Sequence, residues 1–291
     1  MSLPRFIISV FLCLLSGAGF ALAKETPHIV VTIKPVHAIV SALLKDISHP
    51  DLLLKGLSSP HSYHLKPSDA QTLHTAGLII WVGPTLEGYL SKPIALQEGR
   101  AEVMRLMDYI DTGNTKHPEH ERDAHFWLDP LKVIQLIAPL QAVLLKQFPG
   151  KVDIIKKNAG QLEQTLKQLD ISITQRFNQR YTISAIVYHD AWQYFLMRYG
   201  LRIQGIVSTH EQQQPGPAHL YQLQQDIRNK SIQCLLIEPQ YRPGYLKSLV
   251  ADNQLKLVRV DPLGATVTPG PSAYATIMLQ ITGAFTQCLA D

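Results

Sequence analysis

Short apolar runs alternate with amphipathic segments through the first half of the chain. Residues 28–33 (HIVVTI) are rich in β-branched side chains, as is typical of a strand buried on both faces of a parallel sheet. Residues 51–57 and 78–82 (LIIWV) are predicted as two further strands. Two predicted helices lie between these strands. One covers residues 36–44, and the other begins with Ser68 as its N-terminal cap. The alternation predicts an α/β fold with a parallel sheet.

The second half of the chain repeats this alternation. Its predicted strands are residues 183–188, 203–208, 233–238 and 256–260. Helices are predicted from His189 onward, over 218–228 and at the C-terminus, where the helix carries Cys288. Two such patterns in one chain predict two (β/α) lobes, each with its own parallel-type sheet.

A long helix is predicted between the two halves. From residue 152 to residue 177, apolar or small side chains recur at steps of three or four residues, at Ile155, Ala159, Leu162, Leu166, Leu169, Ile173 and Phe177. This segment would extend about 39 Å at 1.5 Å per residue, so we expect one long rigid helix joining the lobes. The predicted organisation is an N-terminal lobe over 24–148, a linking helix over 149–181 and a C-terminal lobe over 182–291.

The first 23 residues have the pattern of a secretory signal peptide. Arg5 is the only charged residue among them, residues 6–15 are apolar, and the segment closes with Ala21, Leu22 and Ala23. The alternative, a retained membrane anchor, is disfavoured because the apolar run is too short to span a bilayer comfortably. We therefore expect export, with cleavage near Ala23.

The net charge and its distribution along the chain give little information about binding partners. The chain has a formal net charge of +4, and its basic residues are scattered without interleaved aromatic side chains. Nothing in this pattern indicates nucleic-acid binding. No later segment has the length and apolarity of a transmembrane helix. We expect the mature chain to be a soluble monomer.

Two cysteines remain after residue 23, Cys234 and Cys288. An even pair in an exported protein predicts a disulfide. Two buried free thiols are the alternative, and the oxidising compartment disfavours them.

The stretch 59–69 (SPHSYHLKPSD) contains the first candidate for binding chemistry. Pro60 and Pro67 stiffen the backbone around His61, which lies between a predicted strand end and a predicted helix start. Loops in that position carry the ligand-binding groups of α/β folds. A neutral imidazole held on such a loop is a good metal ligand.

Two further histidines and one carboxylate occupy comparable positions. His189 directly follows the predicted strand 183–188, and Asp261 directly follows the predicted strand 256–260. His125 ends the polar loop 111–125 and precedes the helix that starts at Asp129. A lone histidine at a strand end is more often structural than a ligand, but three in equivalent places favour a shared site between the lobes.

Three neutral imidazoles suit zinc better than manganese, which takes more oxygen ligands. The sequence also offers other histidines. His117 and His120 lie in the polar loop and are interpreted as solvated side chains rather than as an auxiliary metal site. The role of His64, three residues after His61, stays open.

The motifs taken together resemble a known family. SPHSYHLKPSD, LIIWVGP followed by Glu87, HFWLDP, YHDAWQYF, IEPQYRP and RVDPLG occur in the order found in the metal-specific periplasmic solute-binding proteins of ABC importers. The chain is most similar to the zinc-uptake branch of that family. The two-cysteine arrangement is also similar to that of zinc-binding members.

The resemblance implies two lobes joined by a long helix, with Zn²⁺ held in the cleft between them by His61, His125 and His189. It also implies a periplasmic location and delivery of the ion to an ABC permease. Some zinc-binding members have a glutamate immediately before the first histidine, where this chain has Pro60. The fourth ligand is therefore expected to be water or Asp261.

The sequence leaves three alternatives to a zinc carrier. An exported zinc hydrolase would use the same three histidines, with Glu87 or Glu238 as general base, but the chain lacks HExxH or comparable spacing. A manganese-selective carrier is disfavoured by His189, because manganese-binding members resembling this chain have a carboxylate there. Adhesion, attributed to some relatives, has no support in the composition.

Overall fold

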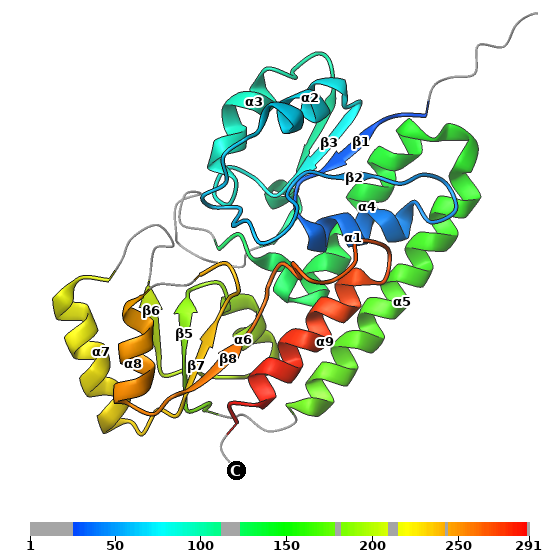
Figure 1. Ribbon diagram of the computed structural model, residues 1–291. Coiled ribbons are helices and arrows are strands. Elements are labelled where there is room, and N and C mark those ends of the chain that lie inside the picture. Colours follow the sequence, from blue (N-terminus) through cyan, green and yellow to red (C-terminus); the bar gives the residue numbers. More distant parts are fainter. Residues whose placement is uncertain (1–25, 112–122, 178–181, 209–214, 242–243, 290–291) are drawn as a thin grey trace, which may run out of the picture.

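The computed structural model describes residues 26–111, 123–177, 182–208, 215–241 and 244–289. It contains two four-stranded parallel sheets with flanking helices (Figure 1). The predicted two-lobe α/β fold is therefore confirmed.

The N-terminal sheet has the strand order β2-β1-β3-β4. Its strands are β1 (Ile29–Val31), β2 (Asp51–Leu52), β3 (Leu78–Trp81) and β4 (Glu102–Arg105). β1 and β3 are wholly buried, because this sheet is covered on both faces. Three helices belong to this lobe: α1 (Lys34–Leu43), α2 (Pro67–Thr75) and α3 (Ser91–Ala95).

The C-terminal sheet has the order β6-β5-β7-β8, which repeats the pattern of the first sheet. Its strands are β5 (Ala185–His189), β6 (Gly205–Ser208), β7 (Cys234–Ile237) and β8 (Lys256–Arg259). The helices of this lobe are α6 (Gln193–Tyr199), α7 (Pro217–Asn229) and α8 (Tyr245–Asp252).

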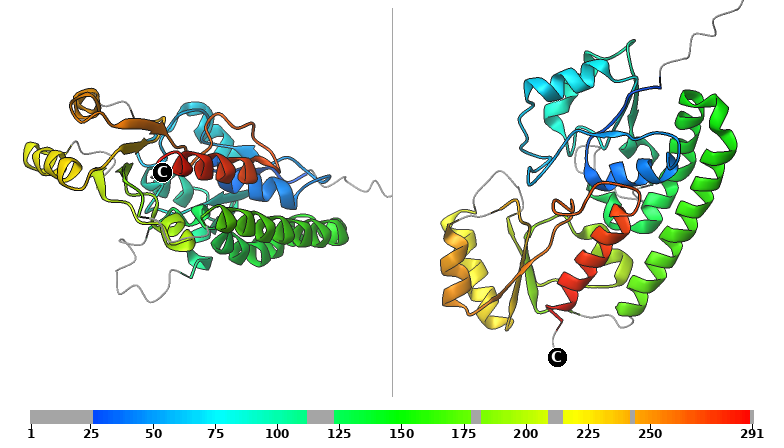
Figure 2. Two further views of the ribbon diagram at one scale, coloured as in Figure 1. Left: turned by 90° about the horizontal axis from the view of Figure 1, so that it is seen from below. Right: turned by 45° about the vertical axis from the view of Figure 1, so that its right-hand side comes forward.

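Three further helices are α4 (Pro130–Gln147), α5 (Val152–Arg176) and α9 (Ala273–Thr286). α5 is the long helix expected from the sequence, and it packs against α4, α1 and α9. The right-hand view in Figure 2 shows α5 running past both lobes, with α9 beside it along the lower lobe. One hydrophobic core extends through both sheets and these helices, so the lobes share packed apolar contacts.

Several element boundaries differ from the sequence prediction. The strand expected over 51–57 is regular only at Asp51 and Leu52, and its backbone hydrogen bonds to the neighbouring segment continue only as far as Leu54. α2 begins at Pro67. Its N-terminus is capped by Asp69 and not by Ser68, because the Asp69 carboxylate accepts a hydrogen bond from the Lys66 N–H. The helix expected from His189 begins at Gln193. The expected C-terminal helix ends at Thr286, before Cys288.

The predicted disulfide is present between Cys234 and Cys288. It links the start of β7 to the segment just after α9, and the two Cα atoms are 5.7 Å apart. Within the described part of the chain, no helix is long and apolar enough to cross a membrane. The predicted signal peptide, His117 and His120 lie outside the described residues.

Candidate metal centre

His61 lies in the loop that connects β2 to α2. Backbone pairing with β1 ends when the Leu54 N–H donates to the Thr32 carbonyl, and the chain then turns toward the second lobe. Pro60 is buried, and the His61 N–H donates to Oγ of Ser59 at 3.2 Å. At the other end, Tyr63 donates its hydroxyl to Asp69 at 2.6 Å. The loop is thus fixed by local hydrogen bonds on both sides of the imidazole.

His125 precedes a short 3₁₀ turn, Phe126–Leu128, whose three side chains are all buried. Asp129 ends this turn and caps α4, since its carboxylate accepts the Leu131 N–H at 2.8 Å. The apolar FWL sequence therefore anchors the histidine to the core shared by both lobes. His125 is 6% exposed, so its ring is removed from bulk water.

His189 is the last residue of β5 and pairs in register with Ser208 of β6. It projects from the carboxyl end of the C-terminal sheet, where ligands bind in open α/β folds. His189 is also 6% exposed. Its neighbour in space is Glu238, the residue directly after β7.

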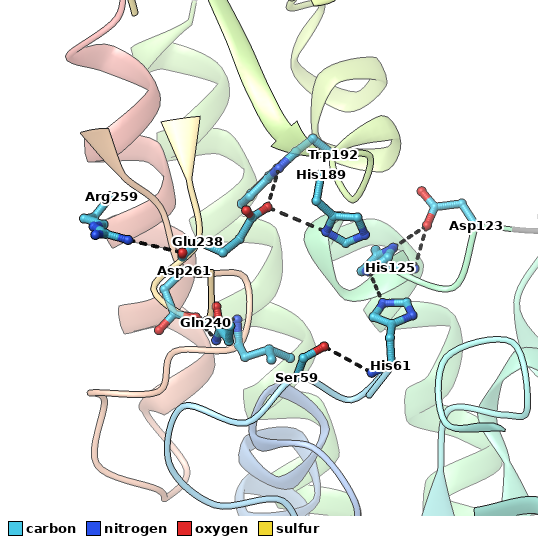
Figure 3. Close-up of polar contacts among 11 residues, drawn as sticks. Ser59, His61, Asp123, His125, His189, Trp192, Glu238, Gln240, Arg259 and Asp261 are labelled. Atoms are coloured by element: carbon cyan, nitrogen blue, oxygen red, sulfur yellow. Dashed lines mark hydrogen bonds and ion pairs between the residues drawn. The ribbon is translucent and has the colours of Figure 1, made fainter. Parts of the chain in front are cut away.

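The three imidazoles meet between the lobes (Figure 3). Their centroids are 5.1 to 5.4 Å apart, and Nε2 of His61 lies 3.2 Å from Nε2 of His125. One nitrogen from each ring falls within a group whose atoms are all within 4.8 Å of one another. Among the described residues, this is the group of histidine, cysteine and carboxylate side chains arranged to hold a metal ion.

Carboxylates lie behind two of the rings. Asp123 Oδ1 is 2.7 Å from Nδ1 of His125 and also accepts the His125 backbone N–H at 2.9 Å. Glu238 Oε1 is 3.7 Å from Nδ1 of His189 and accepts a hydrogen bond from Trp192 Nε1 at 3.3 Å. The Asp123 carboxylate on the outer nitrogen of His125 keeps the proton there and leaves Nε2 of that ring as an electron-pair donor.

Burial dominates the electrostatics of the site. Burial, followed by the nearby His125 and His189 rings, lowers the pKa of His61 to about 2. His61 is therefore neutral at physiological pH, which is the form that ligates a metal. Burial also raises the pKa of Glu238 to about 8, with Trp192 and His125 opposing that rise.

A small cavity of about 10 Å³ adjoins the histidines. It is bounded by Ser59 and Pro60 on the side of the N-terminal lobe, and by Glu238, Gln240, Tyr241, Pro262 and Leu263 on the other side. His125 and His189 also line it. A space of this size holds about one water molecule.

Asp261 lies outside the group of three imidazoles. Its Oδ1 accepts hydrogen bonds from the Leu263 N–H at 3.0 Å and from Gln240 Nε2 at 3.3 Å, while Oδ2 accepts the Ala265 N–H at 2.6 Å. The carboxylate is thus turned into the loop that follows β8. His64 is exposed and is likewise not part of the group.

Asp123 was not predicted as a partner of His125. Its position only two residues earlier in the sequence could have indicated this contact. Glu238 was considered only as a general base, whereas the structure places it behind His189. Its place immediately after a buried strand was the same signal that identified His189 and Asp261.

Comparison with known proteins identifies the family of this chain. The family model described as "Zinc-uptake complex component A periplasmic" matches residues 29–288. The chain is 30% identical to the high-affinity zinc uptake system protein ZnuA of Brucella suis, over 98% of both chains. It is also 30% identical to the ZnuA of Haemophilus ducreyi, over 90% of this chain and 93% of that one.

Solved structures share the fold at low sequence identity. A ZnuA deletion mutant with zinc bound superposes with a TM-score of 0.80, at 19% identity over 92% of this chain and 99% of that chain. The periplasmic zinc-binding protein TroA from Treponema pallidum gives a TM-score of 0.79, at 21% identity over 91% and 100% of the two chains. The match of the family model across both lobes establishes that the chain belongs to the ZnuA family of periplasmic zinc-uptake components.

Proposed function

We propose that this protein captures Zn²⁺ in the periplasm and delivers it to the permease of an ABC importer. The observation that carries the proposal is the convergence of three imidazoles from separate segments at one point between the lobes. Membership of the ZnuA family supports both the identity of the ion and the membrane partner. The protein acts in this proposal as an exported monomeric carrier, with zinc as cargo.

His61, His125 and His189 are the proposed zinc ligands. Zinc–nitrogen bonds of 2.0–2.1 Å at tetrahedral angles place two ligand atoms about 3.3 Å apart. The 3.2 Å separation between Nε2 of His61 and Nε2 of His125 is close to that value. Little movement of these two rings is then needed to bind the ion, which favours tight binding.

We assign the fourth position to water rather than to Asp261. The Asp261 carboxylate already accepts three hydrogen bonds from its own loop and from Gln240, so turning it toward the histidines would break them. The cavity beside His125 and His189 has room for about one water molecule. A nitrogen-rich site with one water suits zinc better than manganese.

The same cavity argues against a zinc hydrolase. Pockets that bind organic substrates have volumes of about 300–1,000 Å³. The space adjoining the imidazoles measures about 10 Å³. One water fits there beside an ion held by the imidazoles, which supports a carrier role over catalysis on an organic molecule.

The test is metal content and competition on the folded, tag-free mature protein. Wild type is expected to retain one zinc that excess manganese does not displace, whereas His189→Ala should lose most of its zinc affinity. His64→Ala is the matched control, because His64 is an exposed histidine outside the group. Absence of bound zinc in the wild type, or zinc binding that is indifferent to His189→Ala, would contradict the proposal.

A further inference from the structure

The loop that follows β8, residues 261–267, is held by two charged side chains. Asp261 accepts hydrogen bonds from backbone N–H groups inside the loop. Lys34, the first residue of α1 in the other lobe, donates from Nζ to the carbonyls of Gly264 (2.6 Å), Ala265 (2.8 Å) and Val267 (2.8 Å). An ammonium group has three N–H donors, so these contacts use all of them.

Lys34 is an unusual residue in this place. It is only 6% exposed, although lysine is almost never fully buried without partners. Burial lowers its pKa, and the negative charge of Asp261 opposes that shift. The three carbonyls and the nearby carboxylate together compensate for the loss of water around the ammonium group.

The loop held by Lys34 borders the candidate metal centre. Pro262 and Leu263 line the same small cavity as His125 and His189. The Pro262 carbonyl accepts a hydrogen bond from Trp127 Nε1 at 2.9 Å, which ties the loop to the segment carrying His125. Gln240 also lines the cavity and donates to Asp261. Asp261 is therefore hydrogen-bonded directly to a side chain that lines the cavity.

The position of the Asp261 carboxylate affects which metal ion the site prefers. Three imidazoles with one water give a tetrahedral, nitrogen-rich site, which suits zinc. Entry of the Asp261 carboxylate would add oxygen ligation and raise the coordination number, both of which favour manganese.

We propose that Lys34 is a specificity-determining residue of the metal centre. By fixing the carbonyls of Gly264, Ala265 and Val267, it keeps Asp261 hydrogen-bonded inside its own loop and out of the coordination sphere. The site therefore selects zinc over manganese. Lys34 touches neither the ion nor its ligands and acts through the loop. The inference rests on the zinc-binding function proposed above.

The test compares zinc and manganese dissociation constants, measured by chelator competition, for wild type and Lys34→Met. The zinc-over-manganese preference should fall by at least about tenfold, equivalent to 1.4 kcal/mol. Adding Asp261→Asn to Lys34→Met should restore the preference, because the neutral amide is a poor ligand. Asn158→Leu is the matched control, since Asn158 also donates to two backbone carbonyls, those of Leu43 and Lys45, within the same core.

A second readout does not depend on metal. In the metal-free protein, amide hydrogen exchange at Leu263 and Ala265 should be faster in Lys34→Met than in wild type, and unchanged in Asn158→Leu. Lys34→Gln serves if the methionine variant does not fold, because it keeps two of the three donors.

Three results would overturn the inference while leaving the zinc carrier intact. They are an unchanged metal preference in Lys34→Met (including equal weakening of both metals), a lost preference that Asp261→Asn does not restore, and unchanged amide exchange at Leu263 and Ala265. A wild-type protein that binds no zinc would instead overturn the proposed function, and the inference with it.

Discussion

Nε2 of His61 lies 3.2 Å from Nε2 of His125, although 64 residues separate them in the sequence. Nδ1 of His125 contacts the Asp123 carboxylate, so that nitrogen carries the proton of the neutral ring. Nε2 of His125 is then left as an electron-pair donor that faces His61, as a metal ion shared by the two rings would require.

Asp123 is expected to control metal affinity through this tautomer. Asp123→Asn keeps the size of the side chain but removes the charge that stabilises a proton on Nδ1 of His125. Zinc affinity should fall by about 10- to 100-fold, as measured by competition titration. Asp108→Asn is the control, because Asp108 is an exposed aspartate paired with Arg105. Equal affinities for Asp123→Asn and wild type would show that Asp123 does not orient the ligand.

The metal-free protein should lose stability on acidification because of His61. The pKa of His61 is about 2 in the folded chain and about 6.5 when unfolded, so the unfolded chain takes up the proton first as pH falls. This contribution is fully present above about pH 6.5 and decreases toward pH 2. At pH 5 the loss is about 2 kcal/mol relative to pH 7. Urea unfolding of wild type and His61→Gln at both pH values measures it, and the variant should show a shallower decline.

The disulfide should contribute to stability without affecting the metal centre. Cys234 begins β7, whereas Glu238 and the histidines lie beyond the other end of that strand. Closing a loop of 54 residues is worth about 4 kcal/mol in the chain-entropy model. The Cys234→Ser/Cys288→Ser variant should unfold at lower denaturant concentration, with zinc affinity unchanged at temperatures where it stays folded. A large loss of zinc affinity in that folded variant would contradict this separation.

Replacing two different glycines by alanine should change the stability of the protein in opposite directions. Gly264 has a φ of +62°, and a Cβ there would lie 2.2 Å from Cγ1 of Ile277, so Gly264→Ala combines backbone strain with a clash. It should lower the free energy of unfolding by more than about 2 kcal/mol. Gly160 lies inside α5 with open space around it, so Gly160→Ala should raise stability by about 0.5–1 kcal/mol. Denaturant unfolding of the two variants provides the comparison, and similar effects of both substitutions would contradict it.

The fold class could be predicted because the strongest sequence signals come from buried strands. The run 78–82 predicts a strand, and β3 occupies Leu78–Trp81 with every residue buried. The edges of the N-terminal sheet were less predictable. β2 was expected over 51–57 but is two residues long, and β4 was not predicted at all. Edge strands such as Glu102–Arg105 carry charged, half-exposed side chains, so hydrophobic periodicity identifies them poorly.

The sequence by itself supplied the three histidines and their likeness to metal-binding motifs, because residue type and position at strand ends are local properties. Only tertiary structure brought His61, His125 and His189 together, since the approach of the rings depends on how two separate lobes pack. It alone also decided the direction of the Asp261 carboxylate. That choice depends on hydrogen bonds within the loop and on Lys34, whose donated bonds span 230 residues or more of sequence and follow from no local pattern.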